Sequence, residues 1–96
     1  MTMLKNPVHP GTILKHEFLD PLGLSSYRLA GELGVPRTRI ERLVAELTRV
    51  TPDTAMRLGK FFGTTPEFWM NLQTNHDMAK AAKTVDVSKI TPLEYA

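Results

Sequence analysis

Apolar residues recur at intervals of three and four positions along most of this chain, which is the spacing of amphipathic helices. No run of alternating apolar and polar residues is long enough to indicate a strand. The pattern divides into five segments, each bounded by capping residues, prolines or glycines: 10–20, 26–33, 36–44, 52–62 and 66–83. The sequence therefore predicts an all-α fold of five helices.

The ends of these segments carry the residues that start and stop helices. Pro10 lies in the first turn of the first segment, which should end before Pro21 because a proline ring disfavours the α conformation of the residue before it. Ser25 or Ser26 can cap the second segment, and Gly34 ends it by adopting a left-handed conformation.

The last two helices begin with the same three kinds of residue. Thr51-Pro52-Asp53 and Thr65-Pro66-Glu67 each combine a hydroxyl cap, a proline at the first helical position and an acid near the positive end of the helix dipole. The apolar positions of the five segments should form one core: Ile13, Leu14, Phe18, Leu19, Leu29, Ala30, Leu33, Ile40, Leu43, Val44, Ala55, Leu58, Phe62, Phe68, Trp69, Leu72 and Met78.

Composition narrows the class of protein. The 96 residues suit one compact domain, and we expect it to span 1–83, with 84–96 as a C-terminal tail. Because cysteine is absent, the chain has no disulfide framework and no thiolate metal site, and a cytoplasmic location is the natural expectation. We expect neither a membrane span nor a signal peptide, since no long apolar run occurs. The net charge of +2 permits a polyanionic partner without requiring one.

The segments 26–33 and 36–44 are separated by a short turn containing Gly34, which is the arrangement of a helix-turn-helix. In that arrangement the second helix can enter a DNA major groove about 12 Å wide. Its apolar positions face the first helix, so Arg37, Thr38 and Arg42 are left on the outer face. Arginine can bridge O6 and N7 of guanine, and threonine can contact a base or a thymine methyl group. We therefore expect these three residues to contact base edges.

A second set of polar residues flanks this helix and is better placed for phosphates than for bases. Its members are Ser26, Arg39, Thr48, Arg49 and Thr51. Glu41 and Glu46 lie nearby and would repel phosphate unless they pair with arginine. The alternative is that the arginines merely solvate an exposed helix face.

The chain resembles the Xre class of helix-turn-helix proteins, and within it the HigA/VapI-type antitoxins. The resemblance covers about residues 6–80, and two motifs carry most of it: Asn6-Pro7-Val8-His9-Pro10-Gly11 and Pro66-Glu67-Phe68-Trp69-Met70-Asn71-Leu72-Gln73. It implies a lambda-repressor-like domain that binds its own promoter as a dimer. It also implies a partner toxin, usually an mRNA-cleaving ribonuclease of the RelE-like fold.

The sequence departs from the family pattern in three places: at Pro36, in the segment 45–48 and at His76. Pro36 stands where a Ser or Thr cap is common, which removes a cap worth about 1 kcal/mol. Ala45-Glu46 replaces the usual Asn-Gly after the recognition helix, and Leu47-Thr48 replaces residues that are often basic. The first two departures should weaken DNA binding. His76 replaces a common tyrosine, which concerns packing.

Other functions have less support in the sequence. His9, His16 and His76 lack the i, i+4 spacing of a helical metal site, so we expect no metal and no cofactor. The aromatic residues around Trp69 could stack on single-stranded nucleic acid, but their helical spacing favours a core. The acids Asp53, Glu67 and Asp77 are explained as helix-start or solvated residues, and an enzyme is not expected.

On the strength of the resemblance, we expect a homodimer formed through the C-terminal half of the chain. Its two recognition helices would lie about one turn of DNA apart, roughly 34 Å, on a palindromic operator. The serious alternative is a toxin-sequestering module whose helix-turn-helix binds DNA weakly or not at all. The residues that separate the two are Arg37, Thr38, Arg39 and Arg42.

Overall fold

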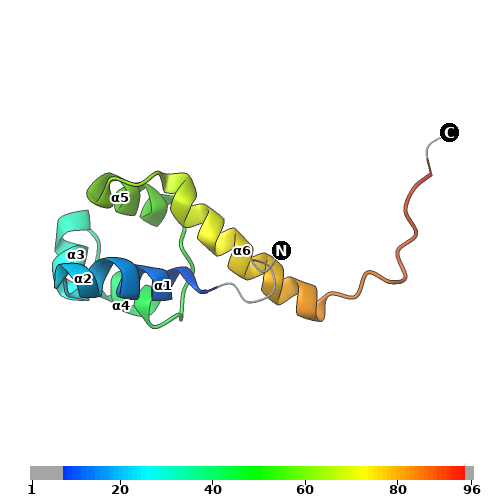
Figure 1. Ribbon diagram of the computed structural model, residues 1–96, viewed down its shortest axis with the longest axis horizontal. Coiled ribbons are helices and arrows are strands. Elements are labelled where there is room, and N and C mark those ends of the chain that lie inside the picture. Colours follow the sequence, from blue (N-terminus) through cyan, green and yellow to red (C-terminus); the bar gives the residue numbers. More distant parts are fainter. Residues whose placement is uncertain (1–7, 95–96) are drawn as a thin grey trace.

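The computed structural model describes residues 8–94 as five helices without a strand (Figure 1). The first helix is continuous and consists of α1 (Pro10–Ile13), the π-helical segment η1 (Leu14–Leu19) and α2 (Asp20–Leu22). The others are α3 (Ser26–Leu33), α4 (Arg37–Val44), α5 (Pro52–Phe62) and α6 (Pro66–Thr84). The prediction of an all-α, five-helix fold is confirmed. In this part of the chain no helix has the length and apolar character needed to cross a membrane.

Most helix ends lie where the local sequence placed them. The Ser25 hydroxyl accepts a hydrogen bond from the Arg28 amide at 3.0 Å, so Ser25 rather than Ser26 caps α3. Thr51 and Thr65 cap α5 and α6 in the same way. Gly34 and Gly63 end α3 and α5 with φ angles of 71° and 74°, in the left-handed region that favours glycine.

The predicted end of the first helix before Pro21 is wrong, because the helix continues to Leu22. The preceding turn is π-helical, and the amide of Asp20 donates to the carbonyl of Lys15, five residues back. A π turn is wider than an α turn, so the proline ring has room beside the preceding turn. Proline has no amide hydrogen, so one carbonyl group in the preceding turn receives no hydrogen bond from this position. Pro21 is exposed, and water can therefore bind that carbonyl group.

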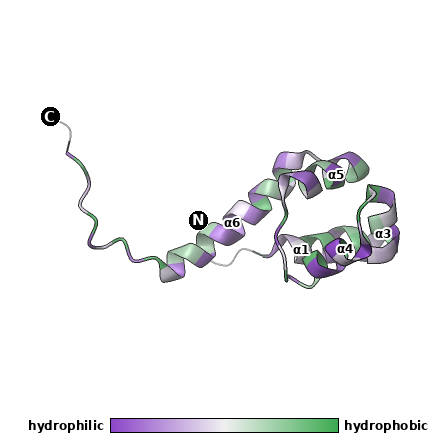
Figure 2. Cartoon of the chain, turned by 180° about the vertical axis from the view of Figure 1, so that it is seen from behind, coloured by the Kyte–Doolittle hydropathy of each residue, from purple (hydrophilic) through white to green (hydrophobic). Residues whose placement is uncertain are grey.

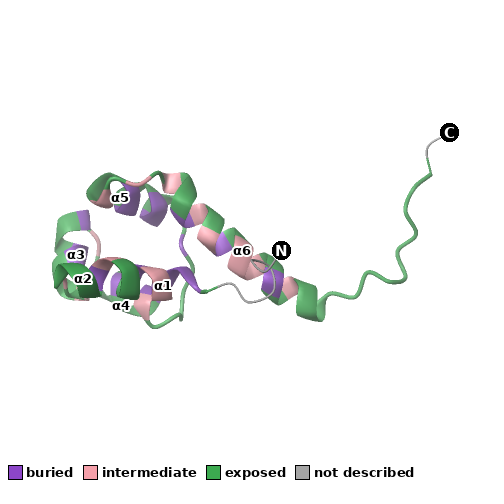
Figure 3. Cartoon of the chain, in the orientation of Figure 1, coloured by how far each residue is buried: buried purple, intermediate pink, exposed green. Residues whose placement is uncertain are grey.

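The core lies between the first helix, α3, α4, α5 and the first half of α6 (Figure 3). Its largest fully buried side chain is Trp69, whose indole Nε1 donates to the Thr64 hydroxyl at 2.8 Å. The Phe18 ring packs against Trp69 with a centroid separation of 5.0 Å. These contacts support the interpretation of the aromatic cluster as core. The buried apolar residues are Leu14, Leu19, Leu29, Ala30, Leu33, Ile40, Leu43, Val50, Ala55, Leu58, Trp69 and Ala79.

Two predicted core residues lie at the surface. Met78 is 54% exposed and Phe68 is 38% exposed. The second half of α6 extends beyond the other helices, and the segment after α6 continues away from them (Figures 1 and 2). No other helix in the described residues covers Met78, although the neighbouring Ala79 is buried. The segment after α6, residues 85–94, is exposed throughout.

A glycine allows the first turn of α1 to approach the end of α4. A Cβ atom added at Gly11 would lie 1.8 Å from the carbonyl oxygen of Leu43. Gly11 is buried, and its amide donates to the His9 Nδ1 atom at 2.9 Å. The absence of a side chain at this position therefore sets the distance between the first helix and α4.

Replacing this glycine should destabilise the fold. We expect Gly11→Ala to lower the free energy of unfolding by about 1 to 3 kcal/mol or more, because backbone atoms must move to admit the methyl group. Gly31→Ala is the matched control, since a Cβ atom there meets no atom within 4 Å and the site lies inside α3. That variant should gain about 0.5 to 1 kcal/mol. Urea unfolding followed by circular dichroism measures both, and equal stability of the two variants would contradict this role of Gly11.

Candidate nucleic-acid interface

Helices α3 and α4 form a helix-turn-helix. Gly34 turns the chain between them, and the Val35 amide donates to the carbonyl of Ala30 at 3.0 Å. Leu29 and Leu33 of α3 and Ile40 of α4 are buried in the common core. This apolar contact leaves the opposite face of α4 exposed to solvent.

The exposed face of α4 carries the three residues predicted to contact bases. Arg37, Thr38 and Arg42 are all exposed. The Arg37 guanidinium lies 5.8 Å from the ring centroid of Tyr27, and its Nε atom lies 3.3 Å from a carboxylate oxygen of Glu41. Arg42 makes no side-chain hydrogen bond or ion pair with any other residue between 8 and 94. The guanidinium of Arg42 is therefore free to meet a ligand.

The start of α4 has no side-chain cap. Pro36 occupies the N-cap position with an extended backbone, and no side chain accepts a hydrogen bond from the first amides of the helix. The Arg39 amide donates to the carbonyl of Pro36 at 3.0 Å. Pro36 thus precedes the helix rather than opening it, and the loss of the cap expected from the sequence is confirmed.

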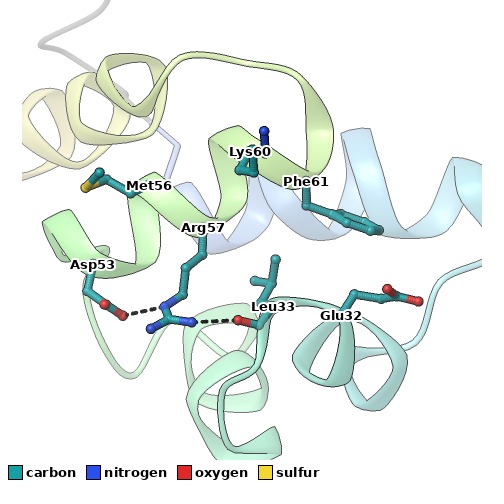
Figure 4. Close-up of a pocket in the computed structure, with 7 residues that line it drawn as sticks. All are labelled: Glu32, Leu33, Asp53, Met56, Arg57, Lys60 and Phe61. Atoms are coloured by element: carbon teal, nitrogen blue, oxygen red, sulfur yellow. Dashed lines mark hydrogen bonds and ion pairs between the residues drawn. The ribbon is translucent and has the colours of Figure 1, made fainter.

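Arg39, predicted to contact phosphate, belongs to an ionic network that joins α3, α4 and α5. Its Nη1 atom and the Nε atom of Arg57 both bind the same carboxylate oxygen of Asp53, in the second case at 3.0 Å. Arg57 also donates from Nη1 to the carbonyl of Leu33, at the end of α3, at 2.8 Å (Figure 4). The two arginines lower the pKa of the Asp53 carboxyl group, chiefly through their hydrogen bonds. Besides its place in the first turn of α5, Asp53 therefore joins α5 to α4.

Arg49, the second arginine predicted to contact phosphate, is tied to α6. Its Nη2 atom lies 2.9 Å from an oxygen of Asp77, whose other oxygen accepts a hydrogen bond from the Gln73 side chain at 2.9 Å. Gln73 in turn accepts from the Val50 amide at 2.7 Å. Asp77 therefore helps to hold the loop between α4 and α5, and its description as a solvated residue was incomplete.

The other predicted phosphate contacts vary in accessibility. Thr48 and Thr51 are exposed, and the Thr51 hydroxyl already accepts a hydrogen bond from the Thr54 amide as the cap of α5. Ser26 lies in the first turn of α3 and is partly buried. All the predicted DNA contacts thus belong to α3, α4 or the loop and cap that follow α4.

Glu46 occupies the turn after α4 in a conformation that favours glycine. Its φ angle is 63°, the one positive value at a non-glycine residue in the described chain. The Glu46 carboxylate accepts a hydrogen bond from the Thr12 hydroxyl at 2.9 Å. The resemblance predicted an Asn-Gly pair at this turn, and its backbone explains why glycine suits the second position.

Sequence reasoning missed most of the partners of these arginines. The pair of Arg37 and Glu41 follows the i, i+4 rule for helix surfaces and was available from the spacing alone. Tyr27, Asp53 and Asp77 lie on other helices, so no local spacing connects them with their arginines. Their contacts depend on how the helices pack.

Two histidines meet beside the loop after α4. The buried His9 ring contacts His76 edge to face, with 4.9 Å between centroids, and its Nδ1 atom accepts the Gly11 amide. Burial, followed by the neighbouring His76, lowers the pKa of His9, although Glu46, Asp77 and a hydrogen bond to the Thr48 backbone oppose this shift. The folded state thus favours neutral His9.

Acidification should therefore destabilise the protein. A lowered pKa in the folded state means that the stabilising effect of neutral His9 is complete above the ordinary pKa of 6.5 and is lost as the pH falls through and below that value. We expect the thermal midpoint to fall between about pH 7.5 and 5.5. In His9→Asn, where an uncharged amide can still cap α1, the fall should be smaller. An equal fall in this variant would assign the effect to other groups.

Comparison with known proteins also identifies a helix-turn-helix in this chain. Residues 16–69 match the family model described as helix-turn-helix, and the exposed arginines lie inside this range. The chain belongs to the Xre-type helix-turn-helix family. Because this family consists of DNA-binding regulators and antitoxins, membership also bears out the expectation that the chain is not an enzyme.

Relatives within the family include named antitoxins. Virulence-associated protein I of Dichelobacter nodosus is 45% identical over 74 residues, which are 77% of this chain and 68% of the relative. The solved structure of the Pseudomonas aeruginosa antitoxin HigA with the higBA promoter is 36% identical, with a TM-score of 0.85 over 93% of this chain and all of that one. The structure of the antitoxin GraA with its operator is also 36% identical, with a TM-score of 0.88 over 94% of each chain. The resemblance stated from the sequence is confirmed.

Proposed function

We propose that this protein is a DNA-binding antitoxin and transcriptional autorepressor of a type II toxin–antitoxin operon. The observation that carries the proposal is the exposed Arg37, Thr38 and Arg42 face of α4, set on a fold that two relatives use in complex with their own operator or promoter DNA. An exposed helix face with two arginines and a threonine is chemically suited to the edges of base pairs in a major groove. In this proposal Ser26, Arg39, Thr48, Arg49 and Thr51 contact phosphates.

The proposed functional unit is a homodimer on a palindromic operator. The second half of α6 and the segment after it carry exposed apolar residues, which support a contact through the C-terminal half: Met78, Val85, Val87, Ile90 and Leu93. A two-fold axis through this region would place the two α4 helices on successive major grooves. Residues 1–83 then form the DNA-binding and dimerisation domain, and 84–96 form the tail.

The proposed protein partner is a toxin of the RelE-like fold, and the compartment is the cytoplasm. The support for both is family membership and the antitoxin relatives. A second candidate function is toxin sequestration with weak or no DNA binding. It is favoured by the uncapped start of α4 and by Glu46, whose carboxylate lies in the turn that follows the recognition helix.

DNA titration separates the two candidates. We expect specific binding to the duplex just upstream of the gene, relative to a scrambled duplex. Arg37→Ala and Arg42→Ala should each cost about 1 to 3 kcal/mol and relax the preference at one base pair. Equal losses on both duplexes would mean that the arginines contact only phosphate. A folded protein that binds neither duplex would favour toxin sequestration.

Dimerisation can be tested at a single exposed position. Met78→Lys should shift the protein toward a monomer in sedimentation velocity, because a charge would enter the proposed apolar contact. Met56→Lys is the matched control, since Met56 is similarly exposed at 64% but lies on α5. If both variants sediment like the wild-type protein, the dimer contact lies elsewhere.

A further inference from the structure

Most of the arginines at the proposed DNA surface are already paired with carboxylates. Arg37 pairs with Glu41, Arg39 with Asp53, and Arg49 with Asp77. Of the four arginines assigned to DNA, Arg42 is the one without such a partner in residues 8–94. We call Glu41, Asp53 and Asp77 the paired carboxylates.

The pairs lie at the surface, where a phosphate can replace the carboxylate. The three arginine side chains are 41% to 59% exposed, and the three acidic side chains are 38% to 53% exposed. Hydrogen bonds from Arg57 and Arg39 lower the pKa of Asp53. Burial raises the pKa of Asp77, but hydrogen bonds from Gln73 and Arg49 outweigh burial and lower it, so both acids stay charged near neutral pH. The Arg37–Glu41 and Arg49–Asp77 pairs therefore present little net charge to an approaching duplex, whereas the Asp53 carboxylate is shared by Arg39 and Arg57 and offsets one of their two charges.

Each pair also leaves part of the guanidinium group available. Glu41 holds Arg37 at Nε, so both terminal nitrogens of this arginine remain for a guanine edge. Asp53 and Asp77 hold one terminal nitrogen each, at Nη1 of Arg39 and Nη2 of Arg49. The carboxylates thus offset the charge of these side chains while they orient them.

We propose that the paired carboxylates set the DNA specificity of this protein by suppressing its binding to non-cognate DNA. This inference rests on the proposed function. Non-specific binding is essentially the electrostatic attraction of phosphates, whereas operator binding also includes base contacts. A fixed negative charge beside each arginine opposes the first contribution in every complex. It opposes operator binding less, because there the oriented guanidinium groups meet their bases and phosphates.

The substitutions that test this idea keep the shape of each side chain and remove its charge. Glu41→Gln is the cleanest, because the Glu41 side chain contacts Arg37 alone among the ion pairs of the described residues. Asp77→Asn retains an oxygen that can accept the Gln73 hydrogen bond. Asp53→Asn is the third variant, and thermal unfolding checks that it folds, since Asp53 joins α4 to α5.

The control removes the same charge away from the proposed DNA surface. Glu67 lies in the first turn of α6, is exposed, and makes no side-chain ion pair or hydrogen bond with another residue in the described part of the chain. Glu67→Gln therefore changes the net charge of the protein by the same amount as Glu41→Gln.

The inference is tested by measuring the affinity of each variant for the upstream and scrambled duplexes by fluorescence anisotropy, over a range of salt concentrations. Each paired-carboxylate variant should bind the scrambled duplex more tightly than the wild-type protein does, and its slope of log affinity against log salt should steepen by about 0.9 per protomer, or about 1.8 for the proposed dimer. Between about 50 and 200 mM salt the change for the dimer amounts to roughly a 12-fold greater loss of affinity. The ratio of upstream to scrambled affinity should fall, and Glu67→Gln should match the wild-type protein.

Unchanged affinity for the scrambled duplex and an unchanged salt slope in Glu41→Gln and Asp77→Asn would overturn the inference. So would an equal effect of Glu67→Gln, because net charge alone would then explain the result. Failure of the proposed function has a different signature: the wild-type protein would not prefer the upstream duplex over the scrambled one, whatever the variants do to the salt slope.

Discussion

The close contact between the first turn of α1 and the last turn of α4 positions the rest of this helix-turn-helix. Gly11 brings the α1 backbone against the carbonyl oxygen of Leu43, at a separation that no side chain could occupy. His9 caps the same turn, and Thr12 from that turn donates to Glu46 just beyond α4. The beginning of the chain thus fixes both the end of α4 and the turn after it, which makes the orientation of the recognition helix a property of the core rather than of the helix-turn-helix alone.

The interactions that stabilise the fold differ in kind from those that hold the arginines of the proposed DNA surface. Leu29, Ile40 and Trp69 hold the helices together by burial, which ionic screening does not weaken. The ion pairs of Arg37, Arg39 and Arg49 lie at the surface, where each contributes little to stability and is screened by salt. Because burial supplies most of the stability, we expect the core to persist when a phosphate replaces a carboxylate in one of these pairs. This separation allows the surface to be tuned for DNA while the core stays unchanged.

The loop between α4 and α5 follows the helix-turn-helix and is bound to α6 by side-chain contacts. Gln73 of α6 accepts the buried Val50 amide, and Asp77 binds Arg49. His76, between them in the same helix, contacts His9. A change in the position of α6, for example on assembly with a second chain, would therefore act directly on residues assigned to phosphate contact. The helix proposed to form the dimer contact and the loop proposed to contact phosphate are thus in direct contact.

The sequence by itself determined what depends on neighbouring residues. Thr51 and Thr65 start helices because their hydroxyls reach amides three residues ahead, and Gly34 ends one because its backbone tolerates a positive φ. The exposed face of α4 likewise follows from helical periodicity. The motifs at the two ends of the family resemblance identified the class of protein before any contact was known.

Only the tertiary structure decided the features that need two distant segments. The helix passes Pro21 because a π turn precedes it, and Met78 is exposed because α6 extends past the helices that could cover it. The partners of Arg39 and Arg49 come from α5 and α6, so packing rather than spacing chose them. Local patterns specify backbone hydrogen bonds within a few residues, whereas burial and ion pairing between helices depend on the distances that the folded core sets.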